Sequence, residues 1–139
     1  MAAFTKFEAF VENLAEKGHN LGSDTLKILL AVDAPSASGD AVKADLTSEL
    51  GTANGYTSGG SAVTITGSSQ TAGTYSLVGT DLVFTASGGQ IGPFRYAVLY
   101  NDTSTGDMLI GYWDYGSNVT LNDGETFTVD FGASILTLA

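Results

Sequence analysis

A single histidine is the residue best suited to acid–base chemistry near neutral pH, and its setting argues against that use. His19 stands between Gly18 and Asn20, just beyond a predicted helix. A cation suits the negative end of a helix dipole, so we expect a capping or surface residue and not a catalyst. The absence of cysteine excludes disulfides, thiolate metal sites and a cysteine nucleophile. No serine-hydrolase, phosphate-loop or dinucleotide motif is present, so we expect neither an enzyme nor a bound cofactor.

Several carboxylates could also do chemistry if the fold brought them together. Two carboxylates suffice for glycoside hydrolysis when they are held about 5 to 10 Å apart. Asp102 and Asp107 precede a predicted aromatic strand that contains Asp114. Calcium could be bound by the same side chains with the neighbouring oxygen-bearing residues Asn101, Asn122, Asp123 and Glu125. These residues match no EF-hand loop, so solvated loop acids without a metal are the expectation.

The aromatic run Tyr112-Trp113-Asp114-Tyr115 is the most distinctive local feature. If exposed, it would form a platform for sugar stacking or the anchors of a protein interface. Alternation along a strand puts Trp113 and Tyr115 on one face and Tyr112 on the other, so at most one set is exposed. Core packing is the interpretation that we favour, and a sugar-binding surface is the alternative.

Residues 4–17 have the period of an amphipathic helix. Its apolar stripe spans about 120° at 100° per residue and consists of Phe4, Phe7, Phe10, Val11 and Leu14. Thr5 and Glu8 have the spacing of a capping box, and Gly18 could supply the left-handed residue that ends the helix. Because an open sheet needs a cover, we expect the stripe to pack on the protein's own sheet. The alternative is a handle that contacts a partner.

Alternating apolar residues predict strands in most of the remaining chain. Residues 25–32 are apolar on both faces, which is typical of a central strand. Further strands are predicted at 63–65, 75–78, 81–85, 93–101, 108–115, 119–121, 125–131 and 134–138. Gly79-Thr80 predicts a tight hairpin and Asn122–Gly124 a turn. Alternation places Phe94, Tyr96, Val98 and Tyr100 on one face of their strand, and turns Thr126, Thr128 and Asp130 outward.

Residues 33–61 form a long connection rich in Ala, Ser, Gly and Asp. Only Val42–Leu46 is strand-like there. A connection of this length inside a compact domain is unusual, so we expect an ordered functional loop or an arm.

These elements predict a mainly β fold in a single domain over residues 1–139. We expect an antiparallel β-sandwich or barrel, jelly-roll-like, with one N-terminal amphipathic helix. The helix should span about 4–17, the long loop about 33–61 and the sheet core about 62–138.

The charge balance limits the partners. Fifteen acidic residues against five basic ones give −10, with no cluster of Lys and Arg. We therefore expect neither nucleic acid nor an anionic membrane as a partner. The first residues run into acidic amphipathic sequence and not into a basic segment with an apolar core, so we expect no signal peptide and assembly in a cytoplasm.

Several segments together resemble a family of small structural proteins of tailed bacteriophages. They are Phe4 to Phe10 leading into His19–Asp24, Ser87–Tyr96, Tyr100–Thr103, Tyr112–Ser117 and Leu121–Phe131. The resemblance spans nearly the whole chain, and none of these segments is a catalytic signature. It implies a virion component, and in particular a capsid decoration or cement protein on the outer surface of the mature head.

The resemblance also implies a way of working. Such a protein binds neighbouring subunits of the major capsid protein lattice and stabilises the expanded arrangement by mass action. If it sits at lattice symmetry points, we expect three-fold or six-fold self-association, and we favour a trimer. The alternatives are a neck or tail component and a carbohydrate-binding or host-adhesion module. The partner contacts that we predict lie on the N-terminal helix and the long loop: Phe4, Phe7, Phe10, Val11, Leu14, Val42, Leu46, Leu50 and Tyr56.

Overall fold

The computed structural model describes residues 2–139, which contain ten strands and one α-helix. The elements are β1 (Phe4–Lys6), α1 (Glu8–Ala15), β2 (Leu26–Ala31), the 3-10 helix η1 (Lys43–Asp45), β3 (Ser61–Ala62), β4 (Ile65–Thr71), β5 (Thr74–Gly79), β6 (Leu82–Thr85), β7 (Ile91–Asn101), β8 (Met108–Leu121), β9 (Thr126–Val129) and β10 (Leu136–Leu138). Every pair of these strands is antiparallel. The prediction of a mainly β, antiparallel fold with one N-terminal helix is confirmed.

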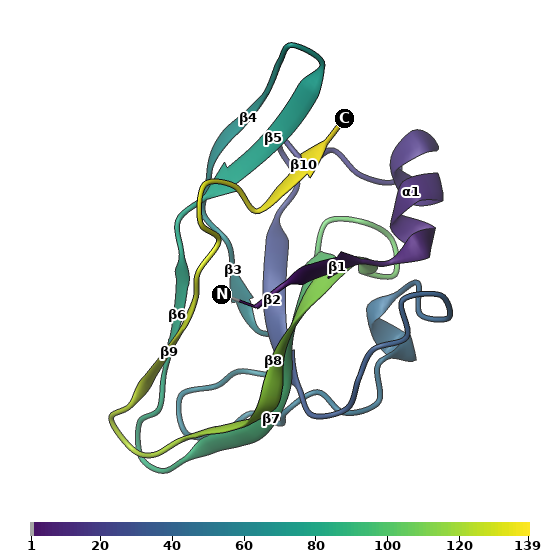
Figure 1. Cartoon of the computed structure of the whole chain (residues 1–139). Coiled ribbons are helices and arrows are strands. Elements are labelled where there is room, and N and C mark those ends of the chain that lie inside the picture. Colours follow the sequence, from purple (N-terminus) through teal and green to yellow (C-terminus); the bar gives the residue numbers. More distant parts are fainter. Residues whose placement is uncertain (1) are drawn as a thin grey trace.

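The strands form a sandwich-like arrangement around one large sheet (Figure 1). This five-stranded sheet has the order β1-β8-β7-β2-β3. One of its faces packs against the two smaller sheets, β10-β5-β4 and β6-β9. On this side the ring centroids of Trp113 in β8 and Phe131, which follows β9, are 5.7 Å apart. The other face is covered by α1 and the connection between β2 and β3. On that side the ring centroids of Phe7 and Tyr112 are 5.3 Å apart.

β2 and its neighbour β7 contribute many fully buried side chains to the core. Leu26, Ile28, Leu29 and Leu30 are fully buried, so β2 has apolar side chains on both faces, as its sequence predicts. Burying such a side chain contributes about 1.5 to 3 kcal/mol. β2 lies between β7 and β3, away from the sheet edge at β1.

The predicted helix is shorter at both ends than its apolar period suggests. Phe4–Lys6 is extended and pairs with β8, where Phe4 lies opposite Trp113 with their rings 5.0 Å apart. Phe4–Lys6 fit the helical pattern, but strand pairing and this aromatic contact stabilise the extended conformation instead. Phe7 is the N-cap and makes no side-chain capping bond, so the Thr5–Glu8 capping box does not form. The left-handed residue after the helix is Lys17, with φ 70°, and not Gly18.

Three expectations about the strands are wrong. The hairpin around Gly79-Thr80 does not form, because β5 pairs with β4 and β10 whereas β6 pairs with β9. Val42–Leu46 is not a strand but contains η1, whose Asp45 carboxylate accepts the backbone N–H groups of residues 41 and 42. Phe94 does not share the face of Tyr96: a register shift separates them, and Phe94 packs on Phe127 of β9 while Tyr96 packs on Tyr112.

Two expectations about the segment after β8 are confirmed. Residues 122–125 form the predicted turn, closed by the Glu125 N–H donating to the Asn122 carbonyl. Thr126, Thr128 and Asp130 are exposed, so β9 turns this face to solvent.

The connection of residues 32–60, here named the 32–60 loop, is fastened to the large sheet. Tyr56 is buried, and its hydroxyl accepts the Leu30 N–H at 3.1 Å and donates to Glu49 at 2.7 Å. Glu49 also accepts the Gly59 N–H, and the Tyr100 hydroxyl donates to the Gly59 carbonyl. Burial raises the pKa of Tyr56 well above its usual range, so the phenol keeps its donor proton. This loop covers a sheet face and is not an extended arm.

Candidate docking groove

An apolar groove runs between α1 and β10 at the open edge of the sandwich. It consists of two hollows, of about 370 and 400 Å³, which share Leu138. The first is lined by Phe4, Lys6, Phe10 and the run Ser134–Leu138. The second is lined chiefly by Leu14, Lys17, His19, Leu21, Tyr75 and Leu138. We name this surface the α1–β10 groove; Figure 1 shows where α1 and β10 lie in the fold.

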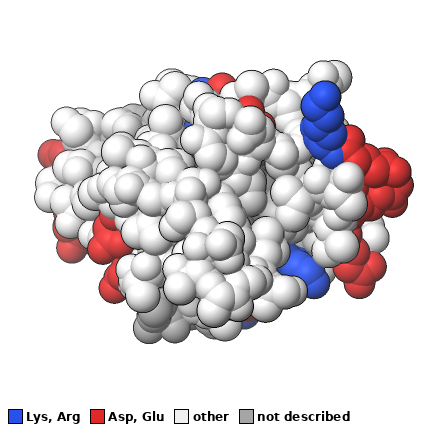
Figure 2. Space-filling view, turned by 90° about the horizontal axis from the view of Figure 1, so that it is seen from above, with Lys and Arg blue, Asp and Glu red and all other residues white. Residues whose placement is uncertain are grey.

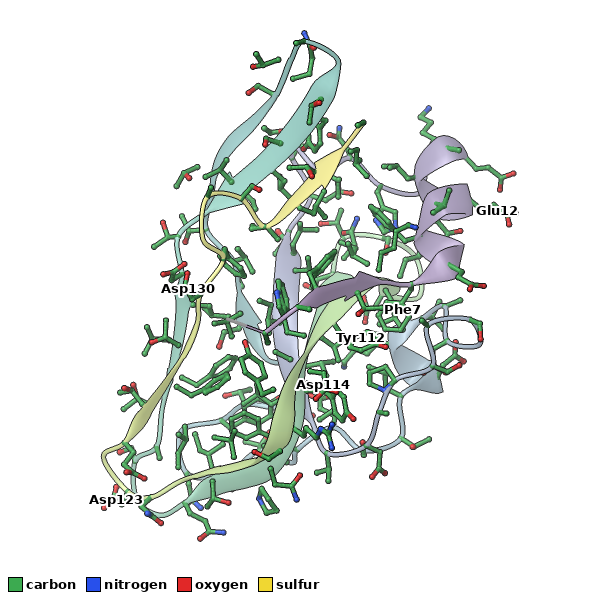
Figure 3. All side chains as sticks on the ribbon, in the orientation of Figure 1. Phe7, Glu12, Tyr112, Asp114, Asp123 and Asp130 are labelled. Carbon is green, nitrogen blue, oxygen red and sulfur yellow. The ribbon has the colours of Figure 1, made fainter. Side chains whose placement is uncertain are left out.

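The groove brings together three of the predicted contact residues. Phe4 and Leu14 are partly exposed, while Phe10 is buried with one side against the hollow. Phe7 is fully buried and turns toward Tyr112, whereas Glu12 points away from the protein (Figure 3). The apolar stripe of α1 therefore covers the protein's own sheet, as we expected, and leaves only its margin open.

The remaining predicted contact residues do not join the groove. Val11 is 53% exposed on α1 and lines neither hollow. Val42, Leu46 and Leu50 are half-buried on the 32–60 loop and line neither hollow. Tyr56 is 2% exposed, so a partner of this folded chain does not reach its ring.

His19 lies at the end of the groove beyond α1 and is buried, so the expected surface position is wrong. Asn101, which is fully buried at the end of β7, fixes its ring. The side-chain oxygen Oδ1 of Asn101 accepts the N–H groups of Thr103 and Ser104, so the side-chain amide nitrogen Nδ2 faces His19 Nδ1 at 3.0 Å. Nδ1 is then the acceptor and the proton resides on Nε2. We name this set, with Asp24, the Asn101 hub.

The electrostatics of the Asn101 hub hold His19 neutral. Burial lowers the pKa of His19, and the nearby Asp24 carboxylate opposes that shift only in part. The Asn101 amide donates to Asp24 at 2.7 Å, and this bond together with the Asn20 N–H lowers the pKa of Asp24. The hub joins the chain after α1 to the β7–β8 connection, and so it fixes the position of one groove wall.

A larger, more polar hollow of about 690 Å³ lies beside β8 and β9. Its carboxylate Asp114 is held by Arg95, with Nε–Oδ1 at 2.7 Å, and accepts the Gly116 N–H. These bonds lower the pKa of Asp114. Burial raises the pKa of Tyr115 to about 12. Both groups thus stay in their ordinary charge states at neutral pH, and the Asp114 carboxylate is already paired with Arg95.

The other groups singled out in the sequence have structural partners. Asp107 precedes β8 and Asp114 lies seven residues further along, so they are about 23 Å apart at roughly 3.3 Å per residue, too far for a glycosidase pair. Asp102 pairs with Lys27 at 3.2 Å. Over residues 2–139, no three acidic or histidine side chains meet in a group that could hold a metal ion.

The aromatic run of β8 packs mainly in the core. Trp113 is 3% exposed, and Tyr96 and Tyr100 on the neighbouring strand are buried as well. A flat sugar-stacking platform at Trp113 is therefore not present, and the core-packing interpretation is confirmed.

Sequence reasoning missed Lys6, Lys17, His19 and the edge position of β10 as parts of a site. The alternation at 134–138 does predict a strand there, but alternation identifies faces and not neighbours. The groove brings α1 and β10 to one hollow although they lie more than a hundred positions apart in the chain, and no local pattern predicts this.

Comparisons with known proteins add no relative. No protein-family model matches the chain, and neither the curated proteins nor the solved structures contain a match. Within the described part of the chain, no helix has the length and hydropathy that a membrane crossing requires.

Proposed function

We propose that this chain is a virion structural protein, a capsid decoration protein that attaches to the major capsid protein lattice on the outside of a phage head. The observation that carries the proposal is the α1–β10 groove, an open apolar surface at a sheet edge of an otherwise acidic protein. The segments that resemble small tailed-phage structural proteins support it and give it its setting. Attachment requires only shape, apolar area and charge.

The physical basis of the role is selective binding. A ligand that binds only the expanded arrangement of the lattice stabilises that arrangement by mass action. Many copies bind the repeating lattice at once. Each bound copy raises the effective concentration of the next binding contact, so weak single contacts together give stable attachment. The charge of −10 keeps the free chain soluble and repels nucleic acid. In Figure 2 most charged side chains lie toward the two ends of the face, and its centre is uncharged.

The fold suits a permanent external fitting. Its large sheet is covered on both faces, and the 32–60 loop is fastened by buried hydrogen bonds. A domain of this kind presents little flexible chain to proteases.

Purified particles of the virus that encodes the chain provide the test. Quantitative mass spectrometry gives the copy number, and electron microscopy with an antibody label gives the location. Copies on the order of hundreds, spread over the head, are expected of a decoration protein on a symmetric lattice. A few copies in a ring at the tail junction would assign the chain to the neck or tail instead. Absence from the particles would reject a virion role.

A further inference from the structure

The edge strand β10 presents its backbone to the α1–β10 groove. The run Ser134–Leu138 lines one hollow, and its last three residues are the whole of β10. Successive side chains of a strand point to opposite faces, so consecutive residues line the same hollow only where it lies along the strand's edge. Within residues 2–139, β10 pairs with β5 on one side and with no strand on the other. Unpaired N–H and C=O groups on such an edge are a template for a further strand.

The side chains of the groove favour an apolar segment. Phe4 and Phe10 on one wall face Ile135, Leu136 and Leu138 on the other. An added strand would turn alternate side chains toward this surface and the others toward solvent. The segment that fits is therefore extended and apolar at every second position.

The basic residues at the groove favour a segment with acidic side chains near its ends. Three of the five basic residues are in ion pairs, namely Lys27 with Asp102, Lys43 with Glu49, and Arg95 with Asp114. Among residues 2–139 the other two, Lys6 and Lys17, are in none of these pairs, and each lines one of the two hollows. On a protein of net charge −10, two free ammonium groups at one groove are complementary to carboxylates.

We propose that the α1–β10 groove receives an extended segment of a partner protein that adds to the free edge of β10. The segment is apolar at alternate positions and carries a carboxylate near each end, one for Lys6 and one for Lys17. The inference rests on the proposed function only for the identity of the chain that supplies the segment, which is then a capsid subunit.

A synthetic peptide tests the groove without any particle. The probe has alternating valine and threonine with a glutamate at each end and about nine residues, which span roughly 30 Å as a strand. A second peptide has lysine at both ends. Fluorescence anisotropy of labelled peptide should show saturable binding of the acid-ended probe, and about tenfold weaker binding of the lysine-ended probe. Equal affinity for both, or no binding at millimolar peptide, would overturn the proposal.

Variants locate the binding. Lys6→Glu combined with Lys17→Glu should reverse the preference between the two peptides, because both rim charges change sign. Leu138→Asp should abolish binding by placing a charge in the shared wall. Val83→Asp is the matched control, since Val83 is 51% exposed on β6, outside the groove, and this variant should bind like the wild type. Circular dichroism of each variant shows whether it is folded, and a charge reversal that leaves the preference unchanged in a folded protein would contradict the inference.

Methylation of the peptide backbone distinguishes strand addition from plain hydrophobic binding. An added strand directs alternate N–H groups to β10 and the rest to solvent. N-methylation of one alternate set should remove binding, and methylation of the other set should change it little. Equal loss from both sets would show that no ladder forms and would overturn the proposal.

Two further outcomes separate this inference from the proposed function. If wild-type protein coats particles and the Lys6→Glu/Lys17→Glu variant coats them equally, the groove assignment fails while the decoration role stands. If the peptides bind as expected but the chain is absent from particles, the groove stands and the virion role fails. Self-association that the charge reversals abolish, measured by sedimentation, would give the groove to a second copy and overturn the partner assigned here.

Discussion

The 32–60 loop and α1 both cover the large sheet, but they differ in how completely they close it. We call the part under the 32–60 loop the closed margin, and the part beside α1, where the groove lies, the open margin. The 32–60 loop, whose composition suggests an arm, is fastened by Tyr56, Glu49 and Tyr100 and ends where Gly60 lies directly against β2. The helix α1, whose stripe suggests a handle, is built into the core through Phe7 and Phe10, and yet an open groove remains beside it. The difference teaches that a polar, glycine-rich segment can close a sheet when a few buried hydroxyl bonds hold it. An apolar helix can leave a sheet edge unpaired.

The closed margin should break most severely at Gly60. A Cβ at this residue would lie 1.8 Å from the Ile28 carbonyl oxygen, and its φ is +78°. Gly60→Ala must therefore push the loop off β2, and we expect a loss above about 4 kcal/mol in the free energy of unfolding. Urea denaturation measures it. Gly73→Ala is the control, because its φ is also positive but the space around it is open, and it should lose only about 1 kcal/mol.

The open margin should break at Gly111. A Cβ there would lie 2.2 Å from the ring of Phe4. Gly111→Ala should displace β1 and cost about 1 to 3 kcal/mol as overpacking does. It should also weaken binding of the acid-ended peptide, since Phe4 lines the groove. Gly51→Ala, with nothing near its Cβ, should match the wild type in urea denaturation and in peptide binding.

Tyr56→Phe sharpens the comparison at the level of single hydrogen bonds. It leaves the Leu30 N–H buried without its acceptor and removes the donor to Glu49. We expect a loss of about 1 to 3 kcal/mol in urea denaturation, with peptide binding unchanged because the residue lies away from the groove. Tyr75→Phe removes an exposed hydroxyl bond to Ser68 and should cost less than about 0.5 kcal/mol. Equal losses in both would mean that the loop bonds contribute little.

A smaller effect should appear with pH. The folded pKa of His19 lies below its ordinary value of 6.5, because burial disfavours the imidazolium more than Asp24 favours it. The unfolded chain therefore takes up a proton first, and stability falls as pH drops below about 6.5, while above that value the contribution is constant.

His19→Asn isolates that effect. The asparagine oxygen lies near the position of Nδ1 and does not titrate in this range. Urea denaturation between about pH 8 and pH 5 should show a smaller decline for the variant than for the wild type. The same decline in both would remove His19 as its source.

The fold class follows from the sequence because alternation and turn residues are local signals. β2, β7 and the turn at 122–125 lie where these signals place them. Phe4–Lys6 does not, because its helical period competes with a partner strand over a hundred residues away, and pairing with Trp113 prevails. The hairpin prediction at Gly79-Thr80 fails for a similar reason. The turn connects β5 to β6, but β5 pairs with β4 and β6 pairs with β9.

The candidate site was only half visible in the sequence. Phe4, Phe10 and Leu14 stand out by their spacing. The opposite wall from β10, and the lysines left without carboxylates, depend on tertiary contacts and on which other charges pair. Tyr56 is predicted as a contact residue because it is an aromatic residue in a polar loop. In the structure its hydroxyl is bonded to the Leu30 N–H of β2, so it belongs to the core.

Hydrogen exchange of the protein, free and attached to particles, tests the central claim most directly. In the free protein, the amides of Leu30 and Tyr56 should exchange slowly, and those on the outer edge of β10 quickly. Attachment should protect β10 and leave the 32–60 loop unchanged. Protection that appears in the 32–60 loop and not at β10 would contradict the account, because the margin described here as closed would then be the one that binds.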